Sequence, residues 1–428
     1  MTNARPACLL SNDPALENQM NRRRFLQRLA VTTAGSGVSW APAAEKRASP
    51  PPDSLPNQDE VLPLVESHRP SRLQKLPPGF RDRVGATHVA GKYHLTQKPF
   101  LIEGAEKLLE LGTRLGKFWF NPDGIAASYS FNSQWGQYKS FVELARSDYF
   151  QQLFALPFAT LLLEAHSPVE QGWRRADLKE DFYQGVTQEF YDLTAHLYRT
   201  YRDRSITIVL QHWEGDWLVR GRGGEAWNPP PQDWPALCER MVRWLVARQA
   251  GVTKARAEYG REAKCRVAHA AEVNRVADAW NNIPTVTRHV LPGVKLDLVS
   301  YSCYDGLRDP LTLWKCLADI RQHARTGPLF GPGAVYVGEI GLPENDQPDR
   351  LTERWDEWMG VLLAAGVKYI AHWELYCNEF SRHAATPPKT PVTDPKQCRG
   401  FWLVKPDGSL SESGKHFQAL WRRAEQHS

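Results

Sequence analysis

The sequence predicts a (β/α)8 TIM barrel, and two observations lead to this fold class. From residue 84 onward, short apolar runs alternate with longer amphipathic stretches, and eight such units fit into roughly 340 residues. The seventh run, in residues 334–345 (AVYVGEIGLPEN), has the β-branched composition of a strand covered on both faces, and it stops at Gly341 and Pro343. A doubly wound open sheet is the main alternative, but no GxGxxG turn occurs near residues 87–96.

The eight predicted strands share short length and apolar composition. They are residues 87–94, 114–120, 159–166, 206–211, 266–271, 296–302, the run in 334–345, and 369–373. Each is followed by a stretch with helical periodicity: from Glu103 onward, then 137–155, 183–202, 234–259, 274–282, 310–324, 350–365 and 411–423. The predicted barrel therefore occupies residues 84–425.

Composition limits the classes of function. The chain has 428 residues, of which 42% are hydrophobic and 24% charged, so it can bury a core of barrel size. Its net charge is only +5, and acidic residues are interspersed with the basic ones, which disfavours nucleic acid as a partner. Sixteen Trp and fourteen Tyr mostly indicate core, yet aromatic rings also suit the apolar faces of sugars.

The N-terminus has the features of an export signal. Residues 21–27 (NRRRFLQ) resemble the twin-arginine motif, with Arg22 and Arg23 as the pair; a weakly apolar run and Ala-Pro-Ala43 follow. We expect a signal peptide in 1–43 and a periplasmic or secreted mature chain, the alternative being an arbitrary basic tail. Residues 44–83 are predicted as a Pro-rich linker that docks on the surface. No other stretch approaches the roughly 20 apolar residues of a membrane span.

Cysteine usage predicts neither a disulfide scaffold nor a zinc site. Of seven cysteines, Cys8 would be removed with the signal, and six are too few to build a scaffold at this size. Cys377 and Cys398 bracket one loop, and they either form a bridge in an oxidising compartment or remain free. No CxxC or clustered Cys/His spacing is present, so we predict no metal and no cofactor.

Glutamates follow four of the predicted strands: Glu164 the third, Glu214 the fourth, Glu272 the fifth and Glu339 the seventh. The carboxyl ends of barrel strands converge, and nearby like charges separate the pKa values of carboxyl groups. Glycoside hydrolysis needs such a difference, because one acid protonates the leaving oxygen while another carboxylate attacks or activates water. For any single glutamate the alternative is an ion pair with Arg or Lys.

With these positions, the chain resembles the clan A retaining glycoside hydrolases over roughly residues 84–425. In that superfamily the acid/base Glu follows strand four, the nucleophile Glu follows strand seven, a strand-six aromatic hydrogen-bonds the nucleophile, and a Trp closes strand eight. The resemblance implies these roles: Glu214 acid/base, Glu339 nucleophile, Tyr301 or Tyr304 the nucleophile's partner, and Trp373 the sugar platform.

Two departures from the family pattern leave alternatives open. The family usually has Asn directly before the acid/base, whereas His212 and Trp213 precede Glu214 here, so Glu272 is the rival acid/base. Glu214 is favoured because it matches the strand number. The family also has Arg after strand two, and Lys117 is nearest to that place.

Four neighbours of the acids are candidate substrate-binding residues. Trp213 and Trp217 flank Glu214 and suit the walls of a sugar subsite, and Asn274 is available to bind a sugar hydroxyl. His212 either binds substrate or holds a neighbouring residue.

Three functions follow, from different classes. The first is an exported glycosidase or endoglycanase that acts with retention on an oligo- or polysaccharide. The second is a metal-dependent barrel enzyme whose four strand-end glutamates bind a divalent ion, with His166, His269 and His372 as possible additional ligands. The third is a catalytically inactive carbohydrate-binding barrel, which the retained acids disfavour.

Overall fold

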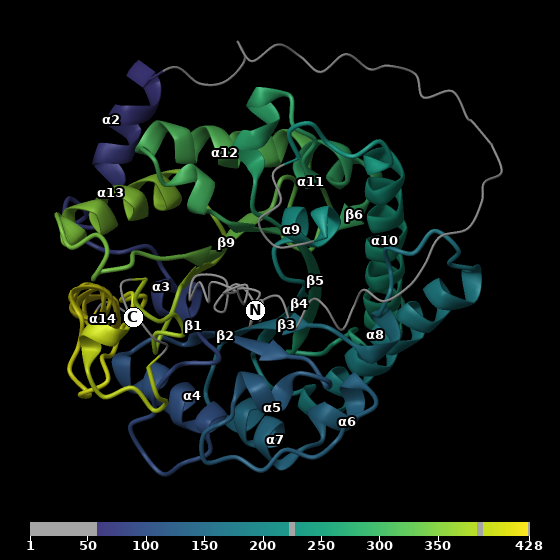
Figure 1. Ribbon diagram of the computed structural model, residues 1–428, viewed down its shortest axis with the longest axis horizontal. Helices are drawn as coiled ribbons and strands as arrows, with labels where there is room; N and C mark the ends of the chain where they lie inside the picture. The colour runs from purple at the N-terminus through teal and green to yellow at the C-terminus, as the bar shows by residue number, and fades with distance from the viewer. Residues whose placement is uncertain (1–57, 222–226, 383–387, 427–428) are drawn as a thin grey trace, which may run out of the picture.

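The computed structural model describes residues 58–221, 227–382 and 388–426 (Figure 1). Parallel strands form a closed barrel in the order β1-β10-β9-β7-β5-β4-β3-β2, which confirms the predicted fold class. The strands are β1 Val84–His88, β2 Leu115–Phe120, β3 Thr160–Ala165, β4 Thr207–Gln211, β5 Arg266–Val273, β7 Leu298–Ser302, β9 Val335–Ile340 and β10 Ile370–His372. A separate short pair, β6 Lys295–Leu296 and β8 Arg325–Thr326, lies outside the barrel sheet.

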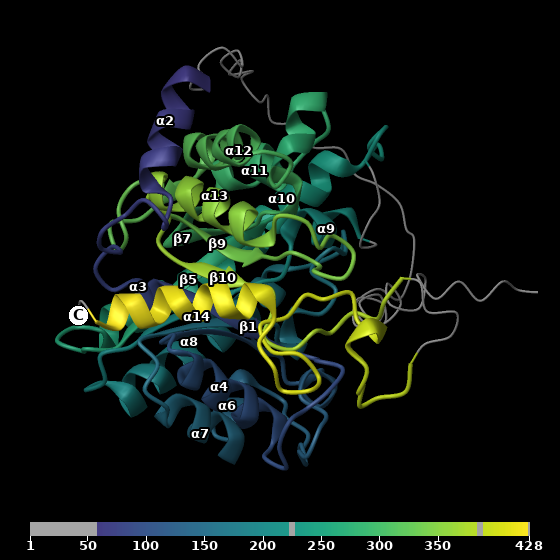
Figure 2. The ribbon, with the colours of Figure 1, turned by 90° about the vertical axis from the view of Figure 1, so that its left-hand side faces the viewer.

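Helices surround the strands, and Figure 1 shows them as a ring around the barrel. The helices that connect successive strands are α4 Phe100–Leu111, α6 Phe141–Ala145, α7 Asp148–Ala155, α8 Glu180–Tyr201, α10 Trp234–Tyr259, α12 Pro310–His323, α13 Leu351–Ala364 and α14 Glu412–Glu425. Shorter helices are α5 Ile125–Ser128, α9 Gly215–Arg220 and α11 Val286–His289. Figure 2 shows α14 lying along the side of the barrel. Its hydrophobic face covers β1, where Trp421 Nε1 donates to Val84 O at 2.9 Å.

Three predicted elements differ from the structure. The first strand begins at Val84 and ends at His88, because Ala90 adopts a φ of 48° that no strand continues. The helix predicted for 137–155 is two helices, since Ser147 ends one and caps the next by accepting from Phe150 N. The predicted helix at 274–282 is a 3₁₀ helix, Val276–Asn281.

The half of the barrel interior near the amino ends of the strands is apolar. Alternate residues of each strand point inward, and those near the strand starts pack as one buried cluster. The cluster consists of Leu115, Leu162, Val209, Ala268, Ala270, Leu298, Ala334, Tyr336, Tyr369 and Ala371. The barrel is therefore a filled core at this end.

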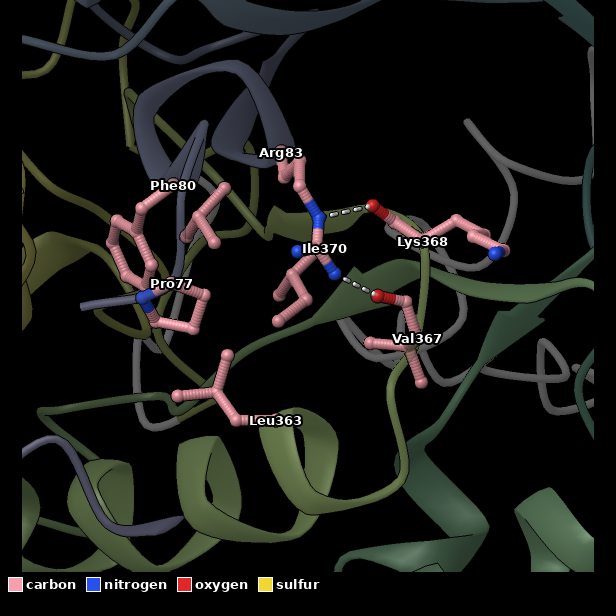
Figure 3. Close-up of a pocket in the computed structure, with 8 residues that line it drawn as sticks. Pro77, Phe80, Arg83, Leu363, Val367, Lys368 and Ile370 are labelled. Atoms are coloured by element: carbon pink, nitrogen blue, oxygen red, sulfur yellow. Dashed lines mark hydrogen bonds between the residues drawn. The ribbon is translucent and has the colours of Figure 1, made fainter. Parts of the chain in front are cut away.

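At the amino end of the barrel, the side chain of Arg83 bonds to main-chain carbonyl groups. Its guanidinium donates to Lys368 O at 3.1 Å and to Val367 O at 2.7 Å, which joins the segment before β1 to the segment before β10 (Figure 3). The cavity beside these residues holds about 10 Å³. That is no more than one water molecule needs, so this cavity is not a ligand site.

The segment predicted as a linker contains a helix that sequence analysis did not predict. Helix α2, Gln58–His68, packs on α13 through its buried residues Val61 and Val65. Arg69 Nη2 also binds Glu357 Oε1 at 2.9 Å. The predicted signal peptide and cleavage site lie outside the described residues. Of the helices in the described ranges, none is long and apolar enough to cross a bilayer.

The six cysteines of the described ranges are buried thiols. Cys377 Sγ donates to Glu379 O at 3.3 Å, and Phe380 pairs with Cys398 as an isolated antiparallel bridge. Of the two alternatives for Cys377 and Cys398, the structure therefore has the free pair, with no bridge between them.

Candidate active site

A buried lysine lies at the centre of the barrel near the carboxyl ends of the strands. Lys117, on β2, has its Nζ 3.3 Å from Glu164, 3.6 Å from Glu272 and 3.8 Å from Glu339. The same Nζ donates to Gly338 O at 3.1 Å. All four side chains are fully buried. Three of the four strand-end glutamates therefore converge, as the sequence predicted, around one ammonium group.

The charges of this cluster are set by burial and by the three carboxyl groups together. Burial opposes the charge of Lys117, but Glu272, Glu164 and Glu339 outweigh it and raise the pKa of Lys117 above its usual range. Burial raises the pKa of Glu164 well above its usual range, although Lys117 acts in the opposite direction. The ammonium is therefore charged, and burial favours the neutral form of Glu164.

A bulge in β9 turns Glu339 into the barrel. The inward residues of β9 are Tyr336, in the interior cluster, and Gly338, whose α-carbon faces Ser300 and Glu272. Strict alternation would therefore point Glu339 outward. The pairing with β7 shifts by one residue, from Tyr301↔Val337 to Ser302↔Glu339, so that two residues of β9 oppose one residue of β7. This shift gives Glu339 access to Lys117.

A glycine is required at position 338 because the side chains of Ser300 and Glu272 approach its backbone closely. A β-carbon there would lie 2.1 Å from Ser300 Oγ and 2.6 Å from Glu272 Oε2. No side chain fits between these groups without moving them. The glycine of the GEIG sequence thus makes room for the polar cluster.

Glu272 is held by three hydrogen bonds in addition to Lys117. Its Oε2 accepts from Gln211 Nε2 at 2.8 Å and from Ser300 Oγ at 2.6 Å, and its Oε1 accepts from Glu214 N at 3.0 Å. A carboxylate with this many donors is poorly placed to give a proton to a leaving group. Glu272 also fixes the main chain of Glu214.

Glu214 lies directly after β4, at the start of α9. Its Oε1 accepts from Ser302 Oγ at 2.8 Å. Ser302 is the last residue of β7 and the register partner of Glu339. The side chain of Glu214 thus reaches the strand pair that carries Glu339.

His212 holds neighbouring residues. Its Nε2 accepts from Glu272 N at 3.2 Å and its Nδ1 lies 3.0 Å from Trp213 O, an arrangement that assigns the proton to Nδ1. Burial, with a smaller contribution from Arg248, lowers the pKa of His212 well below its usual range. A neutral ring with both nitrogens occupied by main-chain groups links β4 to β5, so of the two roles predicted for His212 the structure has the holding one.

Arg248, on α10, fixes the ends of two strands from outside the barrel. It is fully buried, and its Nη2 donates to Ala165 O at 2.7 Å and to Gln211 O at 3.4 Å. Glu170 lies 3.3 Å from its Nε. Arg248 therefore connects α10 and Glu170 to the ends of β3 and β4.

Asp216 organises the loop after β5. Its carboxylate accepts from the main-chain N–H groups of Asn274, Arg275 and Val286, at 3.0, 3.2 and 2.8 Å. In return Asp216 N donates to Asn274 Oδ1 at 3.0 Å. The side-chain oxygen of Asn274 therefore holds this loop, a different use from the sugar-hydroxyl contact predicted for it.

The aromatic candidates differ in their surroundings. Trp373, directly after β10, is buried with its ring 5.8 Å from that of Trp119, which in turn lies over Lys117 Nζ at 5.3 Å. Trp217 has the guanidinium groups of Arg220 and Arg275 at 5.5 and 5.3 Å from its rings. The contacts of Trp217 are thus with arginine side chains, whereas Trp373 packs at a tilt against Trp119, the ring that contacts Lys117.

The prediction for Tyr301 is wrong. Tyr301 alternates with the inward residues Ser300 and Ser302, so its side chain points out of the barrel, and its hydroxyl donates to Asp305 Oδ1 at 2.6 Å. Tyr304, the other candidate, follows the end of β7, and its ring lies 6.2 Å from that of Phe401. A contact of Tyr304 with Glu339 stays a prediction.

Sequence analysis missed the neutral polar residues of the site. Ser300, Ser302 and Gln211 bind the acids, and Tyr336 donates to Gln211 Oε1 at 2.6 Å. A signal was available, because Ser300 and Ser302 lie two residues apart at the end of the sixth predicted strand and so share its inner face.

Of the three histidines proposed as metal ligands, His269 and His372 face away from the barrel interior, and His166 Nε2 accepts from Trp213 N at 3.4 Å. His269 contacts Gln249 of α10, and His372 packs between Trp355 and Phe417. Within residues 58–221, 227–382 and 388–426, no three His, Cys, Asp or Glu side chains are grouped so as to hold a metal ion.

Comparison with known proteins gives likeness in structure only. No family model and no curated protein matches the chain. Among solved structures, a GH5 xyloglucan-specific endo-β-1,4-glucanase from a metagenomic library, in complex with cellotriose, aligns with a TM-score of 0.47 at 9% identity, over 86% of this chain and 100% of that one. A GH5-4 broad-specificity endoglucanase from Clostridium longisporum gives 0.46 at 10%, over 80% and 96%. The virulence factor SghA from Agrobacterium tumefaciens gives 0.45 at 12%, over 84% and 99%. These likenesses are weak, and the barrel assignment rests on the strand order of this chain itself.

Proposed function

We propose that the chain is a glycoside hydrolase that cleaves O-glycosidic bonds with retention, with Glu214 as acid/base and Glu339 as nucleophile. The observation that supports this pairing is the position of Ser302. Its hydroxyl binds Glu214 while its backbone is the register partner of Glu339, so one residue at the end of β7 contacts the side chain of Glu214 and the strand that carries Glu339. A retaining enzyme needs its two carboxyl groups about 5–5.5 Å apart, on either side of one bond.

The surrounding groups suit these two roles. Lys117 Nζ lies 3.8 Å from Glu339 and favours its anionic form, which is the form that attacks the anomeric carbon. The carboxyl group of Glu214 accepts from Ser302 Oγ at 2.8 Å, and its main chain is fixed by Glu272.

The reaction follows in two steps. The carboxylate of Glu339 forms a bond to the anomeric carbon while the glycosidic bond breaks, and the leaving oxygen takes its proton from Glu214. Glu214 then removes a proton from water, whose oxygen attacks the same carbon and releases Glu339. Trp373 and Trp213 are the rings proposed to pack against the sugar, and an oligo- or polysaccharide is the proposed substrate.

A screen with chromogenic glycosides and with bacterial and plant polysaccharides tests this function. We expect hydrolysis of at least one of them, retained configuration of the first-formed product by NMR, and loss of hydrolysis in Glu214→Gln and Glu339→Gln. Activity should survive prolonged chelation, since two carboxyl groups supply the chemistry. Loss on chelation with recovery by one divalent ion would favour the metal-dependent alternative, and sugar binding without hydrolysis would favour the inactive barrel.

We also propose export by the twin-arginine route, supported by NRRRFLQ and Ala-Pro-Ala43 in the sequence. Replacing Arg22 and Arg23 together by Lys should leave the protein in the cytoplasm with an uncut N-terminus. Fractionation and N-terminal sequencing check this expectation. Export and processing of the double variant would contradict it.

A further inference from the structure

A second cavity lies on the carboxyl side of the barrel, next to the proposed active site. It holds about 340 Å³, within the range of small-molecule sites, about 300–1,000 Å³. Its walls come from the loops after β7 and β9, from α13 and from residues 399–401. The side chains that the argument uses are Tyr304, Arg308, Gln347, Arg354, Trp358 and Phe401.

The position of the cavity connects it with the catalytic strands. Tyr304 follows Ser302, the serine that binds Glu214, by two residues, and Gly341 follows Glu339 by two residues. Both belong to the cavity wall. A glycan bound between Glu214 and Glu339 can therefore extend over this wall.

The charges of the cavity single out one arginine. Arg399 is paired with Asp346 at 2.8 Å and Glu379 at 2.6 Å, and Arg308 is paired with Asp309 at 3.2 Å. Arg354 donates to the neutral Gln347 Oε1 at 2.9 Å, and no carboxylate of the described residues lies within ion-pair distance of it. Arg354 thus brings a positive charge to the cavity without a counter-ion from the described chain.

The acidic residue of the lining does not supply that counter-ion. Asp305 accepts from Tyr301 OH at 2.6 Å through Oδ1 and from Ala277 N at 2.8 Å through Oδ2. Both of its oxygens are engaged away from Arg354. The cavity therefore retains capacity for an anion from outside.

Three aromatic rings also line the cavity. The guanidinium of Arg354 lies 5.1 Å from the centre of the Trp358 ring, and Tyr304 and Phe401 meet edge to face at 6.2 Å. Aromatic faces accept the apolar side of a sugar ring, and a fixed guanidinium binds a carboxylate through two parallel hydrogen bonds.

We propose that this cavity binds a uronic acid unit of the glycan, with Arg354 as the residue that binds its carboxylate. The inference rests on the proposed function, because that function makes the ligand a glycan. It adds a substrate class, acidic polysaccharides, and a residue that discriminates them from neutral ones.

Binding measurements on the full chain carrying Glu339→Gln test this proposal without turnover. Methyl β-glucuronide and methyl β-glucoside differ by the carboxylate, and calorimetry or ligand-observed NMR should show the glucuronide binding about ten-fold tighter. Arg354→Ala should abolish the preference, and Arg354→Lys should restore part of it. Arg72→Ala, which removes an equal charge at an exposed site paired with Glu66, should leave the preference unchanged.

Three outcomes overturn the proposal. Equal binding of the two sugars, or no binding, excludes a uronate site. A preference that survives Arg354→Ala in a variant with a wild-type melting temperature places the carboxylate elsewhere. Inorganic sulfate competing as tightly as the glucuronide would make this an anion site without sugar specificity. If the glucuronide preference holds while no glycoside is hydrolysed by the wild type, the site stands and the proposed function fails.

Discussion

The same strands build both ends of the barrel, but their inward residues are apolar at the amino end and charged at the carboxyl end. On β3, Leu162 packs in the apolar cluster and Glu164, two residues later, binds Lys117; on β2 the corresponding pair is Leu115 and Lys117. Both members of each pair point inward, because the side-chain period of a strand is two. The amino half therefore supplies hydrophobic stability, whereas the carboxyl half buries charges that the chain must hold in place. This contrast predicts that substitutions at the two ends change different measurable quantities.

The largest expected effect is on activity at the carboxyl end. Glu339→Gln should lower kcat by about 10³-fold or more, because the attacking group is lost while the size of the side chain is kept. Leu162→Ala, at the other end of the same interior, should lower the free energy of unfolding by about 2–5 kcal/mol and leave kcat of the folded fraction unchanged. Steady-state kinetics and denaturant unfolding check both. If the two variants lost activity in parallel, the division between the ends would be wrong.

The next largest effect is expected at Lys117, because this residue is buried in the barrel interior and also belongs to the charged cluster. Lys117→Met should destabilise the fold by about 3–5 kcal/mol, because it leaves the carboxyl groups of Glu164, Glu272 and Glu339 buried together without their cation. Lys415→Met, at an exposed lysine paired with Glu412, is the matched control and should change stability by less than about 1 kcal/mol. A neutral result for Lys117→Met would show that the cluster does not depend on the ammonium.

The smallest expected effect is a pH dependence of stability due to Glu164. Burial raises its folded-state pKa well above the ordinary value of 4.5. Above pH 4.5 the unfolded chain loses a proton from Glu164 that the folded chain keeps. The contribution of Glu164 to the free energy of unfolding is therefore fully present below pH 4.5 and is lost as pH rises through the folded-state pKa. Glu164→Gln should therefore gain stability relative to wild type as pH rises above about 4.5, the ordinary pKa of the group. A difference that stays constant with pH would contradict the assigned proton.

Most of the fold could be predicted from the sequence because the barrel strands are distinct apolar runs. The predicted second to sixth strands match β2, β3, β4, β5 and β7 closely, and the helix predicted at 234–259 matches α10 at both ends. The first strand was predicted at residues 87–94, whereas β1 spans Val84–His88 and Ala90 has a φ of 48°. Periodicity carries no information on such a local turn.

The acids of the site were predictable by position, but their division of labour was not. Spacing placed Glu164, Glu272 and Glu339 at one end of the barrel, and the structure brings them to Lys117. That Glu272 serves the main chain of Glu214 depends on hydrogen bonds from Gln211 and Ser300, on other strands. Contacts between strands distant in sequence leave no pattern within one segment, which is also why the outward side chain of Tyr301 was mistaken for a partner of the nucleophile.

Trapping the covalent intermediate tests the central claim most directly. The 2-deoxy-2-fluoro analogue of whichever glycoside the protein hydrolyses should form a long-lived glycosyl-enzyme, because the fluorine destabilises the oxocarbenium-like transition state of its breakdown. Peptide mapping by mass spectrometry should then place one sugar on Glu339. A label on Glu272 or Glu214, or no label together with an inverted product, would contradict the proposed roles.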